Sequence, residues 1–268
     1  MAIYDVAIRG GRVVDGAGNP WYYSDIGVRD GKIVRIGSIS ASDADKVIDA
    51  GGLVVCPGFI DLHTHSDVTV LADGDAQSKV RQGVTLDVIG ESNSVGPVEG
   101  PAAAEYREEQ LLRYGVDVTW TDFTGYFQQL IAQGTSINIA SSVAPQQIRR
   151  AVVGFDNRAA EADELEKMKS LVSQAMEQGA VGLSAAWHSG GPEYVDELIE
   201  MAVVAAQYGG YYGTHVGSEG FDIGTELDKT FQIARASGIP VHIYHLKIRG
   251  REHWGQIGGV IDAIESAL

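Results

Sequence analysis

GFIDLHTHSD, residues 58–67, runs from an apolar segment directly into two histidines separated by one residue. A short apolar run of this kind is typical of a strand that is covered on both faces. Because residues i and i+2 of a strand point to the same face, His63 and His65 are expected to project side by side from the strand's end. Two imidazoles so placed can bind one cation, but an isolated His-x-His is more often a hydrogen-bonded or exposed pair. Whether His63 and His65 bind a metal therefore depends on whether further ligand residues occur at other strand ends.

Apolar strands alternate with amphipathic helices from Gly58 onward. The expected strands are residues 58–63, 84–90, 136–143, 180–186, 210–216 and 239–246. The clearest helix runs from Glu161 to Gln178 and ends at Gly179. Strict alternation predicts an α/β fold with a parallel sheet. No Gly-x-Gly-x-x-Gly loop follows the first strand, and polar residues end several strands. These features favour a (β/α)8 TIM-type barrel over a nucleotide-binding sheet, with about six of its eight strands present.

Residues 1–57 follow a different pattern. Short alternating apolar runs are separated by turn residues, which predicts a small all-β segment. Asp30-Gly31 is a strong hairpin signal, and Gly10-Gly11 and Gly51-Gly52 mark further turns. The expected organisation is a β segment over residues 1–57, followed by a barrel domain over residues 58–268 that is incomplete at its C-terminal end.

The charge balance excludes several classes of partner. The chain has 20 Lys and Arg against 36 Asp and Glu, and its net charge of −16 repels nucleic acid and anionic membrane surfaces. No segment approaches the roughly 20 apolar residues of a membrane span, and the N-terminus lacks a signal-peptide pattern. A single cysteine, Cys56, agrees with a reducing compartment. We therefore expect a cytoplasmic protein without nucleic-acid or membrane partners.

Three further residues end apolar runs as His63 and His65 do. Glu91 follows LDVIG, His215 follows YYGT and His245 follows VHIY. Zinc accepts imidazole nitrogen and carboxylate oxygen, and a carboxylate can bridge two cations. The sequence thus predicts one site, made of four histidines and Glu91, that holds one or two Zn²⁺ ions.

These motifs also carry a family resemblance. GFIDLHTHSD resembles the first-strand signature of the amidohydrolase superfamily. Residues 179–220 and 238–255, which begin GAVGLSAAWH and GIPVHIYHLK, resemble its N-acyl-D-amino-acid deacylase (D-aminoacylase) branch. The resemblance implies a metal-dependent (β/α)8 amide hydrolase whose N-terminal strands belong to a separate β-sandwich. It also implies the reaction, in which a small-molecule N-acyl-D-amino acid is cleaved to a carboxylate and a free amino acid.

The resemblance assigns metal ligands by position. His63 and His65 match the first-strand metal pair, and His215 and His245 match the single histidines of strands five and six. Many members carry a second-strand cysteine ligand where this chain has Ser92, so the neighbouring Glu91 is expected to bridge the metals instead.

On the substrate side, Lys247 matches a lysine that holds the substrate carboxylate, and Arg249 is a candidate to assist it. Trp187 aligns with a tyrosine beside the pocket, and His188 is a candidate substrate contact. For each of these residues a role in packing or on the solvated surface is the alternative.

The superfamily's general base is an aspartate at the end of the eighth strand, whereas this sequence stops at VIDAIESAL, which resembles the helix after strand six. The base is therefore expected beyond residue 268, and residues 1–268 alone are expected to have little hydrolytic activity. One alternative function is a cyclic-amide hydrolase of the dihydroorotase or hydantoinase kind. Those enzymes usually bridge their metals with a carboxylated lysine from strand four, which AVGLSAAWH lacks. The other alternative is a non-catalytic metal-binding fragment.

Overall fold

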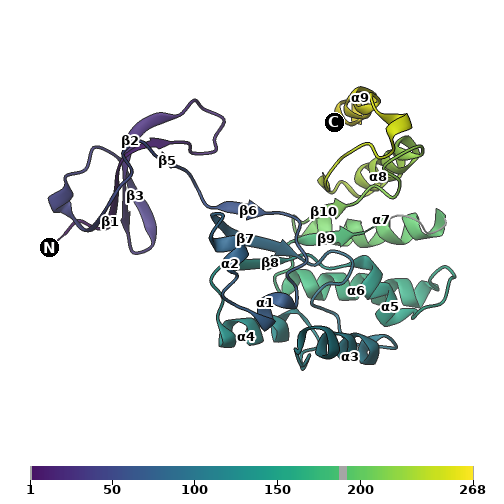
Figure 1. Ribbon diagram of the computed structural model, residues 1–268. Helices are drawn as coiled ribbons and strands as arrows, with labels where there is room; N and C mark the ends of the chain where they lie inside the picture. Colours follow the sequence, from purple (N-terminus) through teal and green to yellow (C-terminus); the bar gives the residue numbers. More distant parts are fainter. Residues whose placement is uncertain (1, 187–191, 268) are drawn as a thin grey trace. The chain divides into compact units, whose positions relative to one another are not determined.

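The computed structural model describes residues 2–186 and 192–267. The chain divides into two compact units, Met1–Phe59 and Ile60–Leu268 (Figure 1). Within the described residues, no helix combines the length and the apolar composition that crossing a bilayer requires.

The first unit is a five-stranded sheet. Its strands are β1 (Tyr4–Val13), β2 (Tyr22–Arg29), β3 (Lys32–Gly37), β4 (Ala44–Asp49) and β5 (Val54–Val55), with a 3₁₀ turn η1 (Ala41–Asp43) before β4. The strand order is β3-β2-β1-β4, and β5 also pairs with β1. β2 runs antiparallel to β1 and β3, whereas β4 and β5 run parallel to β1. The expected all-β character of this segment is confirmed.

Two of the three glycine signals in this unit mark turns. Asp30 and Gly31 have φ values of 51° and 71° between β2 and β3, as a two-residue hairpin turn requires. Gly52 also has a positive φ, of 78°, in the turn that precedes β5. The predicted turn at Gly10-Gly11 is wrong, because both residues lie inside β1. There the pairing with β2 shifts register between Ile8 and Gly11, so the two glycines form an irregularity within the strand.

The second unit contains all six expected strands. They are β6 (Phe59–Asp61), β7 (Val84–Ile89), β8 (Asn138–Ser141), β9 (Gly182–Ala185), β10 (Tyr211–Thr214) and β11 (Val241–Ile243). Each is shorter than its apolar run, mainly because the last residues of the run already belong to the loop that follows. The pairs β7/β8, β9/β10 and β10/β11 are parallel, as expected.

The strands follow one another in chain order. They form two three-stranded sheets, β6-β7-β8 and β9-β10-β11. A parallel bridge between Val143 and Leu183 joins the two sheets. In the described part of the chain no pairing connects β6 to β11, so these six strands do not form a closed barrel.

Helices connect these strands. They are α1 (Thr69–Ala72), α2 (Gln77–Val80), α3 (Ala103–Tyr114), α4 (Phe123–Gln133), α5 (Pro145–Val152), α6 (Ala162–Glu177), α7 (Pro192–Gln207), α8 (Ile223–Ser237) and α9 (Ile257–Ala267), with a 3₁₀ turn η2 (Arg251–His253). Helices α5 to α9 pack against their neighbours in chain order, and α5 and α7 also contact β9 (Figure 1).

Helix α6 shows how the sequence fixes these elements. Glu161 and Glu164 form a capping box that satisfies backbone N–H groups of the first turn, so the helix begins where the pattern predicts. Its apolar stripe faces the core, where Met168 and Val172 are fully buried.

Candidate metal centre

Five polar side chains meet at the carboxyl ends of four strands. His63 and His65 follow β6, Glu91 follows β7, His215 directly follows β10, and His245 follows β11. Strands that run parallel in one sheet present these ends at a common edge, so residues far apart in the sequence come together there.

Glu91 lies at the centre of this group, with only 4% of its side chain exposed. Its Oε2 atom lies 2.7 Å from His63 Nε2 and 3.0 Å from His65 Nε2, and its Oε1 atom lies 2.8 Å from His215 Nε2. The two oxygens of one carboxylate therefore face different histidines.

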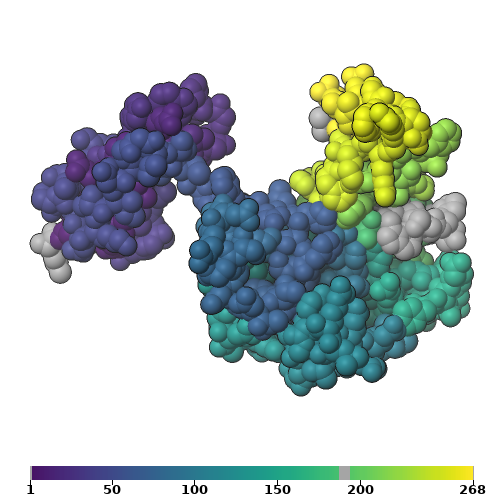
Figure 2. Space-filling view, viewed as in Figure 1, coloured from purple at the N-terminus to yellow at the C-terminus, as the bar shows by residue number. Residues whose placement is uncertain are grey.

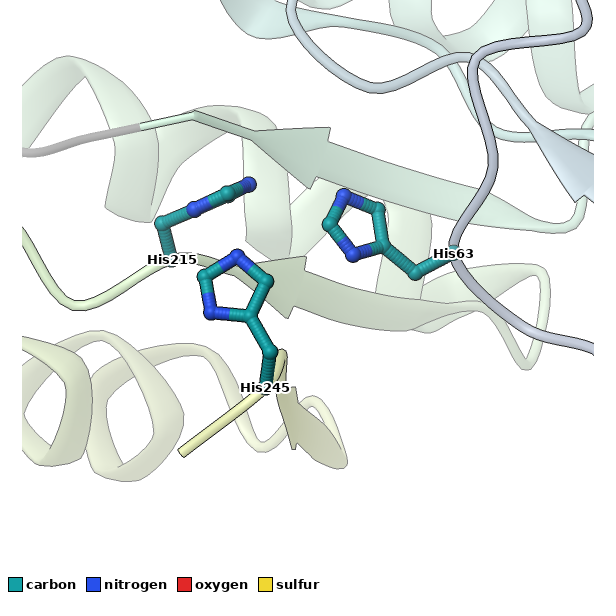
Figure 3. A group of neighbouring side chains, drawn as sticks. All are labelled: His63, His215 and His245. Carbon is teal, nitrogen blue, oxygen red and sulfur yellow. The ribbon is translucent and has the colours of Figure 1, made fainter. Parts of the chain in front are cut away.

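His245 completes a second cluster. Figure 3 shows His63, His215 and His245 approaching one another from three different segments, with ring nitrogens directed toward a shared space. One nitrogen from each of these three rings lies within 4.8 Å of the other two, and the same spacing holds for the donor atoms of His63, His65 and Glu91. His63 thus belongs to both clusters.

A glycine directs Glu91 into the site. Gly90 has a φ of +97°, a conformation that L side chains rarely adopt, and a Cβ atom there would lie 2.0 Å from the Ser142 carbonyl oxygen. The Gly90 N–H donates to Asp67 Oδ1 at 2.8 Å, which ties the end of β7 to the loop that carries His63 and His65. The backbone conformation that places Glu91 in the site is therefore fixed by Gly90 and by the hydrogen bond between its N–H and Asp67.

Tyr244 orients His63. The two rings stack with centroids 4.2 Å apart and an interplanar angle of 10°. The Tyr244 hydroxyl lies 2.9 Å from Ser184 Oγ. A Cβ atom on Gly213 would lie 2.0 Å from that hydroxyl, so the glycine in β10 leaves room for the tyrosine. Tyr244 was not among the residues predicted from the sequence, although an aromatic residue directly before His245 was a usable signal.

A polar network holds the loop that carries His63 and His65. Lys79 Nζ donates to Asp61 Oδ2 at 2.6 Å and to Thr64 Oγ1 at 3.0 Å, and it lies 3.4 Å from Asp87 Oδ1. Ser66 Oγ donates to Asp87 Oδ2 at 2.8 Å. Lys79 on α2 thus connects Asp61, before the His-x-His motif, and Thr64, within it, to the buried carboxylate of Asp87 in β7.

Burial and the contacts with Glu91 shift the pKa values of several groups at the site in different directions. Burial alone would raise the pKa of Glu91, but the contacts from His215, His65 and His63 outweigh it and hold the pKa well below its usual value. Burial lowers the pKa of His63, whereas the Glu91 contact raises the pKa of His65. Burial raises the pKa of Asp67 to about 7.

The residues present fit a divalent metal ion. His215 Nε2 is buried and, within the described chain, has no hydrogen bond of good geometry although it faces Glu91. At metal–ligand distances of about 2.0–2.1 Å, donor atoms around a tetrahedral zinc lie about 3.3–3.4 Å apart. The separations of 2.7–3.0 Å around Glu91 are hydrogen-bond distances and a few tenths of an ångström shorter than this spacing, so the groups would separate slightly around an ion. Imidazole nitrogens and a carboxylate are also the donors that zinc prefers.

A wide cavity of about 980 Å³ opens beside His215 and His245, and Lys247, Arg249 and Glu219 also line it. Glu219 Oε1 accepts from Lys247 Nζ and lies 3.2 Å from His245 Nδ1. Arg249 is exposed, and its side chain has no partner among the described residues.

Two predicted substrate contacts, Trp187 and His188, lie outside the described residues.

Comparisons with known proteins agree with this geometry. The sequence model described as "Amidohydrolase family" matches residues 46–266. A D-aminoacylase from Alcaligenes xylosoxydans xylosoxydans is 35% identical over 99% of this chain and 55% of its own length. An N-acyl-D-glutamate deacylase from the same organism is 33% identical over 98% of this chain and 54% of its own length. The chain thus spans about half the length of these curated relatives.

Solved structures give the same result. A D-aminoacylase structure matches with a TM-score of 0.85 and 35% identity, over 98% of this chain and 56% of the other. An N-acyl-D-glutamate deacylase from Bordetella bronchiseptica, complexed with zinc and a phosphonate inhibitor, matches with a TM-score of 0.87 and 30% identity, over the same shares. With its clustered histidines, its α/β architecture and these similarities in sequence and structure, the chain belongs to the amidohydrolase family.

Proposed function

We propose that the chain is part of a metal-dependent hydrolase that cleaves N-acyl-D-amino acids to a carboxylate and a free amino acid. The observation that carries this proposal is Glu91, a buried carboxylate whose two oxygens face His63, His65 and His215. The similarity to D-aminoacylase and to N-acyl-D-glutamate deacylase supports the substrate class.

In this proposal the six strands of the second unit are part of a (β/α)8 barrel domain over residues 58–268. Their parallel pairs and their order along the chain support it. Residues 1–57 are then the N-terminal part of a β-sandwich, consistent with a sheet whose β3, β4 and β5 side chains include several exposed apolar residues.

Four histidines and Glu91 would hold one or two Zn²⁺ ions. His63 belongs to both donor clusters. Glu91 has two oxygens that face different histidines, so its carboxylate could bridge two ions. Zinc bound there would lower the pKa of a water molecule and polarise the scissile carbonyl. Gly90, Tyr244 and Lys79 hold the ligands in place before any ion binds, which limits the reorganisation that binding requires.

Lys247 would bind the substrate carboxylate, with Arg249 at the rim of the same cavity as a second cation. A cationic contact suits an anionic substrate, since the chain as a whole carries a net charge of −16. Trp187 and His188 remain proposed substrate contacts on the basis of sequence position. The cyclic-amide alternative gains no support from β9, whose sequence GLSA contains no lysine.

Zinc and ligand binding to the purified chain tests the proposal without requiring turnover. We expect the chain to retain zinc against a chelator and the zinc-loaded chain to bind N-acetyl-D-leucine more tightly than its L enantiomer in calorimetry. A His215→Ala variant should lose zinc affinity, whereas His253→Ala, outside the cluster, should keep it. Equal zinc retention by the two variants, or no preference for the D enantiomer, would refute the proposal.

A further inference from the structure

A second cavity borders the candidate metal centre. It has a volume of about 270 Å³ and lies between α3 and the residues that follow β6 and β7. Figure 2 shows the dark teal surface of α3 adjoining the blue surface of the chain after β6. We call this cavity the α3 pocket. It is lined by His65 and Glu91, whereas the cavity that contains Lys247 is lined by His215 and His245.

The two cavities differ in charge. The α3 pocket contains the carboxylates of Glu91 and Glu109 and the carboxyl group of the buried Asp67, and its guanidinium, Arg113, already lies 3.5 Å from Glu109. A ligand carboxylate would therefore be repelled from the α3 pocket. The other cavity is lined by Glu219 and Glu252 as well as by two cations. Lys247 pairs with Glu219, whereas the Arg249 side chain has no partner among the described residues and is available to an anion.

The α3 pocket contains a polar side chain that lacks a partner. Gln110 is only 6% exposed, and among the described residues its amide makes no hydrogen bond. The amide is therefore available to a ligand in the pocket, and a ligand that offers both a donor and an acceptor can hydrogen-bond to it. Val68, Tyr106 and Tyr114 provide apolar surface around it.

We propose that the α3 pocket binds the acyl group of the substrate and prefers a neutral acyl chain that is longer than acetyl and carries a hydrogen-bonding group for Gln110. This inference rests on the proposed function. An amide is planar and trans, so its acyl chain and its amino-acid half extend in opposite directions from the C–N bond. With the carboxylate at Lys247 and the carbonyl at the metal ligands, the acyl chain extends toward His65 and Glu91, which line the α3 pocket.

Calorimetry on the zinc-loaded chain with three ligands tests this assignment. The ligands are N-acetyl-, N-butanoyl- and N-(3-hydroxybutanoyl)-D-leucine. A buried methylene improves affinity about fourfold, so N-butanoyl-D-leucine, with two more methylenes, should bind about fifteenfold more tightly than the acetyl compound. The added hydroxyl should improve binding by about another fivefold through Gln110. Gln110→Leu should remove the hydroxyl's advantage, and Gln128→Leu, on the exposed side of α4, should retain it.

The outcomes separate this inference from the proposed function. If no N-acyl amino acid binds, both fail. If the acetyl compound binds but the longer chains bind no better, the α3 pocket does not hold the acyl group. If the hydroxyl's advantage persists in Gln110→Leu, the proposed contact is wrong. The comparison of ligands on the unaltered chain does not depend on how well the variant folds.

Discussion

Replacing Lys79 with methionine should weaken the second unit more than its partly exposed position suggests. The lysine neutralises Asp61 and Asp87, and only 1% of the Asp87 side chain is exposed. Asp87 Oδ1 has no hydrogen bond within the described chain and lies 3.4 Å from Lys79 Nζ. Lys79 therefore supplies the positive charge beside Asp87. Removing Lys79 leaves the Asp87 carboxylate without that charge, in a place that water reaches poorly.

The expected loss in the free energy of unfolding is about 3 kcal/mol. Removing one partner of a buried ion pair costs about 3–5 kcal/mol. We expect the lower end because Ser66 still donates to Asp87 Oδ2, and because Asp61, at 34% exposure, can be solvated when the lysine is gone. With a urea dependence of about 3 kcal/mol per molar for a domain of this size, the midpoint should fall by about 1 M.

The fluorescence of Trp120 can follow urea unfolding of this unit. Its ring is 4% exposed in the core, whereas Trp21 and Trp254 are 53% and 69% exposed. Lys169→Met is the matched control, since Lys169 pairs with Glu166 and Glu200 on the surface, and its midpoint should not change. Adding Asp87→Asn to Lys79→Met should restore most of the loss, because the stranded charge is then gone. If the double variant is no more stable than Lys79→Met, or if the control falls equally, the buried-charge argument is wrong.

Three further outcomes follow from named contacts. Glu91→Gln removes the charge that faces three imidazoles, so zinc affinity measured by chelator competition should fall more than about tenfold; an unchanged affinity would exclude Glu91 as a ligand. Glu219→Gln loosens the carboxylate contact at His245 Nδ1 and should weaken zinc binding by about tenfold, whereas Glu252→Gln in the same cavity should not. Burial raises the pKa of Asp25, but the N–H groups of Ile39 and Gly10 and the nearby Arg9 outweigh it, so the folded pKa is lowered. Asp25 therefore stabilises the first unit above its unfolded pKa of about 3.9, and this stability is lost as pH falls through the lower folded pKa. Circular dichroism in urea should accordingly show a stability deficit of Asp25→Asn at pH 6 that shrinks below pH 4, and a deficit that is constant with pH would contradict the assignment.

The sequence could predict the elements whose signals are local. Six apolar runs became six strands because each is bounded by a loop or helix signal within a few residues. The capping box at Glu161 likewise fixed the start of α6. Side chains at strand ends can be grouped from the sequence alone, since parallel strands bring those ends to one edge.

Contacts between residues of different helices, strands and loops could not be predicted from local sequence patterns. Lys79 lies on a four-residue helix, and its sequence neighbours do not indicate that it contacts Asp61 and Asp87. The pairing of Lys247 with Glu219 depends on how the loop after β10 meets the loop after β11, a contact between residues 28 positions apart. The predicted turn at Gly10-Gly11 was wrong because a glycine pair is compatible with an irregularity inside a strand as well as with a turn, and the local sequence does not distinguish the two.

The proposed use of Glu91 as a metal ligand, in place of a cysteine at position 92, is consistent with the contacts after β7. Ser92 stands where many members of the resembling branch carry a cysteine, and here its hydroxyl donates to Glu91 Oε1 at 3.0 Å. The serine therefore supports the neighbouring carboxylate, which the left-handed Gly90 directs into the site. A cysteine at this position would offer one donor atom, its sulfur. The Glu91 carboxylate offers two donor atoms, with Oε2 beside His63 and His65 and Oε1 beside His215. Glu91 can therefore contact both donor clusters while the histidines keep their places at the strand ends.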